Sequence, residues 1–245
     1  TAITFDPADS QTLYYGTQRV YRTTNGASNW AAISPNLSNG PHNGNLAYGT
    51  VTSIDVSPLD SNVIYAGTDD GNVWVTQNSG ANWTLLSDTL PNLWVTKVLA
   101  SSSEVSHVYV TFSGYRYGED NGHVFKSADF GSTWIDISNN LPDIPVNDIL
   151  KDNYGNLFLG TDIGVLASAD EGENWEPLGI NMPSVVVNDM HIHENSEYLY
   201  VATYGRSSYK LDISNNILST SSTALASAIT LYPNPASEYV NLSFS

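Results

Sequence analysis

The segment 113–123 gathers the residue types best suited to contact a polar ligand. We single out Tyr115, Arg116, Tyr117 and Glu119 within it as candidate ligand-binding residues. Aromatic rings offer flat apolar faces, and the charged groups beside them supply hydrogen bonds, which is the combination that sugar recognition requires. The segment therefore predicts a carbohydrate-binding loop, and a solvated loop without a ligand is the alternative interpretation.

A second group of interest lies at His191 and His193, which alternate along one expected strand with Asp189 in phase. Alternate residues of a strand point to one face of its sheet, so the two imidazoles could form a metal pair. We interpret them instead as solvent-facing residues of an inner strand. The chain has no cysteine, and neither a Ser/His/Asp arrangement nor a phosphate-binding loop is discernible. We predict no metal and no cofactor.

The charge balance narrows the classes of partner. The 245 residues carry 25 acidic against 8 basic side chains, a formal net charge of −17. Such a surface repels phosphate backbones, which argues against nucleic acid and anionic membranes as partners. No apolar run approaches the roughly 18 residues that a membrane-spanning helix needs, so we predict no transmembrane segment.

The elements that would position these residues are indicated by a motif that occurs four times. In each copy a Ser or Thr stands two residues before an Asp or Asn, and a Trp follows five residues later. The motif residues are Thr23, Asn25 and Trp30; Thr76, Asn78, Gly80 and Trp83; Ser127, Asp129, Gly131 and Trp134; and Ser168, Asp170, Gly172 and Trp175. The acidic or amide side chain can accept backbone N–H bonds and close its own turn. The glycine tolerates a positive φ. The first copy has Ala27 in the glycine position, so we expect a shifted or looser loop there.

The tryptophans recur at intervals of 53, 51 and 41 residues, and each interval holds about four short apolar strands. First strands are expected at 2–5, 51–56, 95–100, 146–151 and 187–192. A period of this length with four strands per unit predicts the blades of an all-β propeller. We place the propeller at 1–213, with blade units at about 1–46, 47–92, 93–143, 144–182 and 183–213. The fifth unit lacks the motif, so we expect it to be one strand short. We also expect a fragment cut upstream, because the chain begins within a strand.

The pattern changes after residue 213. Residues 214–228 are of low complexity and predict a linker. Residues 229–245 begin an alternating strand after Tyr232-Pro233-Asn234-Pro235-Ala236. This segment resembles the start of a type A C-terminal sorting domain of the type IX secretion system, a β-sandwich that would be truncated here. The resemblance implies the type IX machinery as a partner and a secreted or outer-surface location in a Gram-negative bacterium.

The turn motif itself resembles the Asp-box, or BNR repeat, of sialidases, xyloglucanases and sortilin-type propellers. The resemblance implies that the motif residues are structural and lie away from the ligand face. That face is built by the loops that join second to third strands and one blade to the next. On this mapping Asp70, Tyr204 and Arg206 join the ligand-binding candidates of segment 113–123.

The resemblance also raises two enzymatic alternatives. Sialidases bind a carboxylate with three arginines, whereas this chain has only Arg19, Arg22, Arg116 and Arg206 and no Arg-Ile-Pro motif. Xyloglucanases place a catalytic acid in a Thr-Asp-x-Gly loop, which implies Asp69 and Asp162 as acids here. The family's two acids come from two facing propellers, and inverting hydrolysis needs carboxylates about 6.5–9.5 Å apart. Asp69 and Asp162 fall on expected blades two apart in one ring.

We therefore expect a binding protein without a catalytic residue, with a polysaccharide or a protein as its ligand. Part of a glycoside hydrolase of xyloglucanase type is the alternative. A purely structural adhesin is a third reading.

Overall fold

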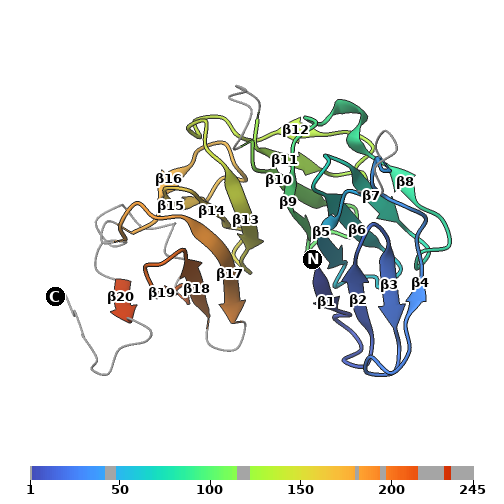
Figure 1. Cartoon of the computed structure of the whole chain (residues 1–245). Coiled ribbons are helices and arrows are strands. Elements are labelled where there is room, and N and C mark those ends of the chain that lie inside the picture. The colour runs from blue at the N-terminus through green and yellow to red at the C-terminus, as the bar shows by residue number, and fades with distance from the viewer. Residues whose placement is uncertain are drawn as a thin grey trace. The chain divides into compact units, whose positions relative to one another are not determined.

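The computed structural model describes residues 2–41, 48–114, 122–179, 182–193 and 197–214, and the backbone of 229–232. The chain forms two compact units, Thr1–Asp136 and Ile137–Ser245. The described residues form five four-stranded antiparallel sheets and contain no α-helix, only a short 3-10 turn at Ser87–Thr89 (Figure 1). The sequence prediction of an all-β chain with five repeated sheets is thereby confirmed. We call each sheet a blade and number the blades in chain order.

Every blade is a meander in which strands pair in chain order. Blade 1 consists of β1 (Ile3–Phe5), β2 (Leu13–Gly16), β3 (Val20–Thr23) and β4 (Ala31–Ala32). Blade 2 consists of β5 (Val51–Val56), β6 (Ile64–Thr68), β7 (Val73–Thr76) and β8 (Thr84–Leu85). Blade 3 consists of β9 (Val95–Ala100), β10 (Val108–Phe112), β11 (Val124–Ser127) and β12 (Ile135–Asp136). Blade 4 consists of β13 (Val146–Lys151), β14 (Leu157–Thr161), β15 (Gly164–Ser168) and β16 (Glu176–Pro177).

Blade 5 differs from its prediction. It contains β17 (Val187–His193), β18 (Tyr198–Thr203) and β19 (Ser208–Asp212), but β20 (Ile229–Tyr232) pairs with β19 as a fourth strand. The expectation that this blade lacks its outer strand is therefore wrong. The outer edge of β19 presents backbone N–H and C=O groups that a further strand can satisfy, and Ile229–Tyr232 supplies one. The predicted linker falls at 214–228, of which 215–228 lie outside the described residues, as do 233–245 of the predicted sorting domain.

The second strands of blades 2, 3 and 4 are buried along their whole length. All residues of β6, β10 and β14 are buried, because each of these strands is covered on both faces. Glycines in these strands let the following blade approach closely. A Cβ atom on Gly67 would lie 2.3 Å from Cγ1 of Val95, and one on Gly160 would lie 2.8 Å from Cγ1 of Val187. In these two pairs the first strand of the later blade therefore packs directly on the second strand of the blade before it.

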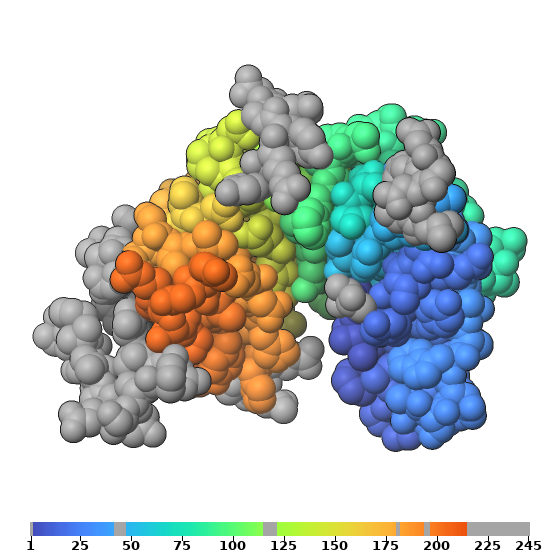
Figure 2. All heavy atoms as spheres, viewed as in Figure 1, coloured from blue at the N-terminus to red at the C-terminus, as the bar shows by residue number. Residues whose placement is uncertain are grey.

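Polar side chains also tie consecutive blades together. The Val98 N–H donates to Oγ of Ser53 at 3.0 Å, and the Met190 N–H donates to Oδ2 of Asp148 at 2.7 Å. Ser53 and Asp148 hold the same place in blades 2 and 4, opposite the glycine of the second strand. Apolar clusters fill the remaining space between blades 1 and 2, 2 and 3, and 4 and 5. In Figure 2 the spheres of blade 5 (orange) cover those of blade 4 (yellow) without a visible gap.

Candidate functional site

The four turn motifs form the same hydrogen-bonded loop. In blade 3 the Ser127 hydroxyl donates to Oδ1 of Asp129 at 2.8 Å, and Oδ1 also accepts the Thr133 N–H at 2.8 Å. The Gly131 N–H donates to Oγ of Ser127 at 2.8 Å. The hydrogen bonds from Thr133 and then Ser127 lower the pKa of the Asp129 carboxyl, so both oxygens stay engaged as an anion within the turn.

The first copy adopts this loop despite its missing glycine. Ala27 takes the glycine position with φ 68° and donates its N–H to Oγ1 of Thr23 at 3.2 Å. The Asn29 N–H donates to Oδ1 of Asn25 at 3.0 Å, which matches the bond from Thr133 to Asp129 in blade 3. An alanine can occupy this left-handed conformation at a modest cost in backbone strain. The first motif turn therefore makes the same hydrogen bonds as the turn of blade 3, and these bonds do not show the looser loop that we predicted.

Each motif turn lies at one end of its blade. The Ser79 N–H donates to the carbonyl oxygen of Asn62, and the Phe130 N–H donates to that of Ser106, both in the loop between first and second strands. In an antiparallel meander the loop between second and third strands lies at the opposite end. The structure thus separates the motif turns from the loops that carry Asp69, Asp70, Asp162, Tyr204 and Arg206.

In blade 2 this opposite end carries two adjacent acids with different surroundings. Both oxygens of Asp70 are bonded: Oδ2 accepts the Asn39 N–H at 2.7 Å and Oδ1 accepts the Thr68 hydroxyl at 2.6 Å. Asp69 accepts the Thr50 N–H through Oδ1 at 2.6 Å, and its Oδ2 has no donor among the described residues. Asp70 therefore holds the loop in shape, whereas Asp69 keeps one oxygen available to a ligand.

A tryptophan that the sequence analysis did not single out follows a loop that contacts the Asp69 loop. Trp94 is 50% exposed, directly before β9, and its carbonyl oxygen accepts the Ser113 N–H at 3.0 Å. The neighbouring Asn92 packs on the Asp69 loop, since a Cβ atom on Gly71 would lie 2.5 Å from Oδ1 of Asn92. The position of Trp94 in a loop between two blades was the sequence signal that could have identified it as a ligand-binding candidate. Tyr48, which is 43% exposed, stands two residues before Thr50, whose N–H binds Asp69 at this end of blade 2.

Segment 113–123 begins beside Trp94. The Phe112 N–H donates to the carbonyl oxygen of His123 at 2.9 Å and closes the base of the segment. The predicted ligand residues Tyr115, Arg116, Tyr117 and Glu119 lie outside the described residues.

Unit 2 carries the corresponding loops of blades 4 and 5. Oδ1 of Asp162 accepts from Nδ2 of Asn147 at 2.9 Å, and the same amide donates to the Val187 carbonyl oxygen at 3.0 Å. Tyr204 is 74% exposed, and its N–H donates to the carbonyl oxygen of Val186. Arg206 is exposed two residues later. Asp162 thus resembles Asp69, with one oxygen bonded and the other without a donor in the described ranges.

The histidines and the arginine that the sequence analysis considered also have described positions. His191 and His193 are exposed on β17, and within the described ranges no three or more His, Cys, Asp or Glu side chains cluster as a metal site would need. Arg19 donates from Nη1 to the Ser34 carbonyl oxygen at 3.0 Å, so this arginine is engaged within its own blade. No helix in the described part of the chain is long and apolar enough to cross a membrane.

No family model and no curated protein matches the chain. Solved structures do match it. An ancestral GH74 enzyme superposes with a TM-score of 0.65 at 22% identity, over 85% of this chain and 29% of that one. The GH74 xyloglucanase from Xanthomonas campestris superposes with a TM-score of 0.64 at 14% identity, over 86% of this chain and 36% of that one. The fold is a β-propeller. The propeller chain spans about a third of the length of these enzymes.

A third match has a different role. PorZ, described as a bacterial surface component of the type IX secretion system of Porphyromonas gingivalis, superposes on this propeller with a TM-score of 0.62 at 16% identity. The match covers 86% of this chain and 32% of PorZ. At such identities the likeness establishes the propeller fold, and the role must be argued from the loops.

Proposed function

We propose that this propeller binds a polysaccharide through the loops between second and third strands and between blades. The observation that supports the proposal most strongly is that the loops at one end of unit 1 carry both the half-exposed Trp94 and Asp69, whose Oδ2 has no donor among the described residues. A sugar ring stacks its C–H face on an indole and donates hydroxyl hydrogens to a carboxylate. The loop end of the propeller offers both groups.

The fixed positions of the Asp69 carboxylate and of the Trp94 backbone favour binding. The Asp69 carboxylate is held by the Thr50 amide, and the Trp94 backbone is held by Ser113. Because the Asp69 carboxylate is already held, a ligand loses little freedom of that side chain on binding. Segment 113–123 starts at Ser113, so Tyr115, Arg116, Tyr117 and Glu119 belong to the same proposal. Tyr204 and Arg206 are proposed as ligand-binding residues of unit 2 in their own right.

The test measures binding of the purified chain to plant and bacterial polysaccharides on a glycan array and by affinity electrophoresis. We expect Trp94→Ala to weaken binding about tenfold or more, as for a central aromatic contact. Trp30→Ala is the matched control, because Trp30 is 39% exposed but belongs to the motif-turn end of blade 1. Equal loss in both variants, or an array without any bound glycan, would refute the proposal.

A glycoside hydrolase is the second candidate, favoured by the matching environments of Asp69 and Asp162. Each is a Thr-Asp-x-Gly aspartate with one oxygen held by an N–H donor. This activity predicts that reducing sugars are released from xyloglucan and that Asp69→Asn lowers the rate by several orders of magnitude. Binding of xyloglucan without any release of reducing sugars would rule out this candidate and leave the first.

We also propose export by the type IX secretion system to a secreted or outer-surface location in a Gram-negative bacterium. The support is the segment Tyr232-Pro233-Asn234-Pro235-Ala236 with its following alternating residues. Expression of the natural protein in a type IX host, with and without this segment, tests it. The protein should remain in the periplasm when the segment is deleted, and export unaffected by the deletion would contradict the proposal.

A further inference from the structure

Blades 2, 3 and 5 are each covered on one face by the blade before them in the chain, and we call this the front face of a blade. The front face of blade 2 packs in one apolar cluster with Tyr14, Val20 and Leu37 of blade 1. Its members are Ile54, Val56, Ile64, Ala66, Trp74 and Trp83. The four aliphatic members are at most 7% exposed. A preceding blade therefore removes this face from solvent.

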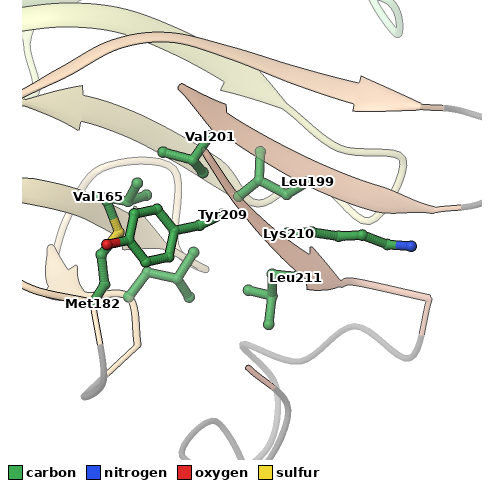
Figure 3. A pocket seen from close by; sticks show the side chains of 8 residues that line it. Val165, Met182, Leu199, Val201, Tyr209, Lys210 and Leu211 are labelled. Atoms are coloured by element: carbon green, nitrogen blue, oxygen red, sulfur yellow. The ribbon is translucent and has the colours of Figure 1, made fainter. Parts of the chain in front are cut away.

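The front face of blade 5 is covered in the same way. Leu199, Val201 and Tyr209 form one cluster with apolar residues of blade 4, and none of the three is more than 8% exposed. In Figure 3 the Tyr209 ring lies beside Val165 and Met182, whereas the Lys210 amine points away from this group. The same apolar contact between consecutive blades thus occurs in both units.

Blade 1 has a front face of the same kind, but this face is exposed. By strand register and motif position, the six front-face residues of blade 2 correspond in order to Ile3, Phe5, Leu13, Tyr15, Tyr21 and Trp30. Ile3 is 63% exposed, Phe5 61%, Tyr15 38% and Trp30 39%. None of the six residues carries a charge in a chain of net charge −17. A contiguous exposed apolar face of this kind marks a docking surface.

Trp30 also carries an indole N–H without an acceptor in the described structure. Each of the other three motif tryptophans donates its indole Nε1–H to a carbonyl oxygen directly after the fourth strand of the preceding blade. The pairs are Trp83 with Ile33 at 2.8 Å, Trp134 with Leu86 at 3.3 Å and Trp175 with Ile137 at 2.8 Å. The Trp30 ring instead meets the Tyr15 ring edge-on, with ring centres 6.1 Å apart. Blade 1 thus offers a donor where the other motif blades have used theirs.

Three residues indicate that the partner of blade 1 lies farther from it than blade 1 lies from blade 2. A Cβ atom on the motif glycine Gly80 would lie 2.6 Å from the Ile33 carbonyl oxygen. Ala27 stands at this position in blade 1, so its Cβ atom requires additional space. Phe5 and Tyr15 are larger than the valine and alanine at their positions in blade 2, and they can fill that space.

The exposed rear face of blade 5, on a second copy of the chain, fits this surface poorly. Ala202 pairs with Ser208 there, where the second and third strands of blades 1, 2 and 4 pair a glycine with a valine. His191, Tyr200 and Ala202 are exposed on this face. Burying such polar groups against an apolar face costs free energy unless each finds a hydrogen-bond partner. The partner of blade 1 is therefore an uncharged apolar sheet of a different kind.

We propose that the front face of blade 1 docks a further four-stranded blade of the motif type, which precedes β1 in the natural polypeptide. The docking blade presents an uncharged apolar face, and the carbonyl oxygen after its fourth strand accepts the Trp30 indole N–H. The chain order follows the three described contacts, in each of which the covering blade directly precedes the covered one. The surface is a sheet face and not the loop end proposed for polysaccharide, so either proposal can fail without the other.

The first experiment compares the chain 1–245 with the natural protein that includes its upstream coding sequence. Hydroxyl-radical footprinting with mass spectrometry measures the oxidation rates of Phe5, Tyr15 and Trp30. We expect these rates to be at least about fivefold lower in the longer protein, because docking covers the three rings. Tyr154, which is 46% exposed in blade 4, is the internal control and should be oxidised equally in both.

Three outcomes of this experiment would overturn the proposal. The first is equal oxidation of the three rings in both proteins. The second is an upstream sequence shorter than 41 residues, the smallest interval between motif tryptophans, because it could not hold a blade. The third is protection of the rings in the chain 1–245 alone as its concentration rises, with a dimer seen by light scattering, which would assign the face to a second copy.

Matched variants connect the protection to stability. Phe5→Ser should leave the melting temperature of the chain 1–245 almost unchanged and should lower that of the longer protein by about 3 °C or more. Val56→Ser, at the covered position in blade 2, should lower both. Trp30→Phe and Trp83→Phe form a second, more conservative pair with the same expected pattern. If Phe5→Ser and Trp30→Phe leave the melting temperature of the longer protein unchanged, the proposed docking is refuted.

Discussion

The indole N–H of Trp83 in blade 2 donates to the carbonyl oxygen of Ile33 in blade 1, 50 residues earlier in the chain, at 2.8 Å. The same residue of blade 1 contacts the motif glycine, because a Cβ atom on Gly80 would lie 2.6 Å from the Ile33 oxygen. A local turn motif therefore also forms the contact between neighbouring blades. The stability of each blade should depend on this contact.

Trp83→Phe should lower the free energy of unfolding of unit 1 by about 1–3 kcal/mol. The phenyl ring keeps part of the apolar contact but leaves the Ile33 carbonyl oxygen without its donor. Urea denaturation followed by far-UV circular dichroism measures the change. Trp30→Phe is the control, since Trp30 is 39% exposed and no indole hydrogen bond is seen for it in the described structure. A loss of equal size in both variants would show that the hydrogen bond contributes nothing.

Two glycines of unit 2 separate backbone strain from packing. Gly172 and Gly155 both have positive φ, 95° and 92°. A Cβ atom on Gly172 would lie 2.9 Å from Cβ of Ile137, whereas one on Gly155 would meet no atom within 4 Å. Gly155→Ala should cost about 1 kcal/mol of unfolding free energy from strain alone. Gly172→Ala should cost about 1–3 kcal/mol more, because it also overpacks the contact between blades. Chemical denaturation measures both, and equal costs would contradict the packing argument.

Tyr65 and Tyr14 hold the same buried position in blades 2 and 1, but their hydroxyls differ. The Tyr14 hydroxyl donates to Oδ2 of Asp6 at 3.2 Å, whereas the Tyr65 hydroxyl has no hydrogen-bond partner in the described structure. Tyr65→Phe should leave stability unchanged or raise it by up to about 1 kcal/mol, and Tyr14→Phe should lower it by about 1 kcal/mol. Phe158 already occupies this position in blade 4. Thermal denaturation of both variants checks the contrast, and a destabilised Tyr65→Phe would reverse the interpretation.

Asp55 should make the stability of unit 1 depend on pH. Its Oδ2 accepts the Ala100 N–H at 2.7 Å, but burial outweighs this bond and the nearby Lys97 and raises the pKa of the carboxyl to about 6. A raised pKa in the folded state means that folding favours the protonated acid. The associated stability is fully present below the unfolded pKa near 3.8 and is lost as the pH rises through about 6. The loss is on the order of 1–3 kcal/mol.

Asp55→Asn tests this dependence, because the amide oxygen can still accept the Ala100 N–H while carrying no charge. The variant should be more stable than the parent protein at pH 7.5 and should show a flatter stability profile between pH 4 and 6. Urea midpoints at half-unit pH intervals provide the comparison. A variant whose profile parallels that of the parent would assign the pH dependence to other groups.

The four motif turns and most strands could be predicted from the sequence because their signals are local. The spacing of Ser127, Asp129 and Gly131 fixes a hydrogen-bonded loop within eight residues, and β-branched residues mark the strands on either side. First strands expected at 51–56 and 95–100 occur at those bounds. The fourth strand of blade 5 was missed because no motif precedes Ile229, so only the free edge of β19 identifies its partner.

The candidate site was less predictable because exposure depends on tertiary neighbours. Trp94 and Trp175 each stand directly before a strand, yet Trp94 is 50% exposed and Trp175 is 3% exposed. Asp69 and Asp70 are adjacent and of the same residue type, and only the contact of Asp70 with Asn39, 31 residues away, shows which one is used in the fold.

The direction of the tryptophan hydrogen bonds has a consequence for synthesis on the ribosome. In all three pairs the carbonyl acceptor precedes the indole donor by 38–50 residues along the chain. Since synthesis proceeds from the N-terminus, every acceptor has already emerged when its donor arrives. Each new blade therefore docks onto a surface that is already made, and the protein can assemble in the order in which it is translated.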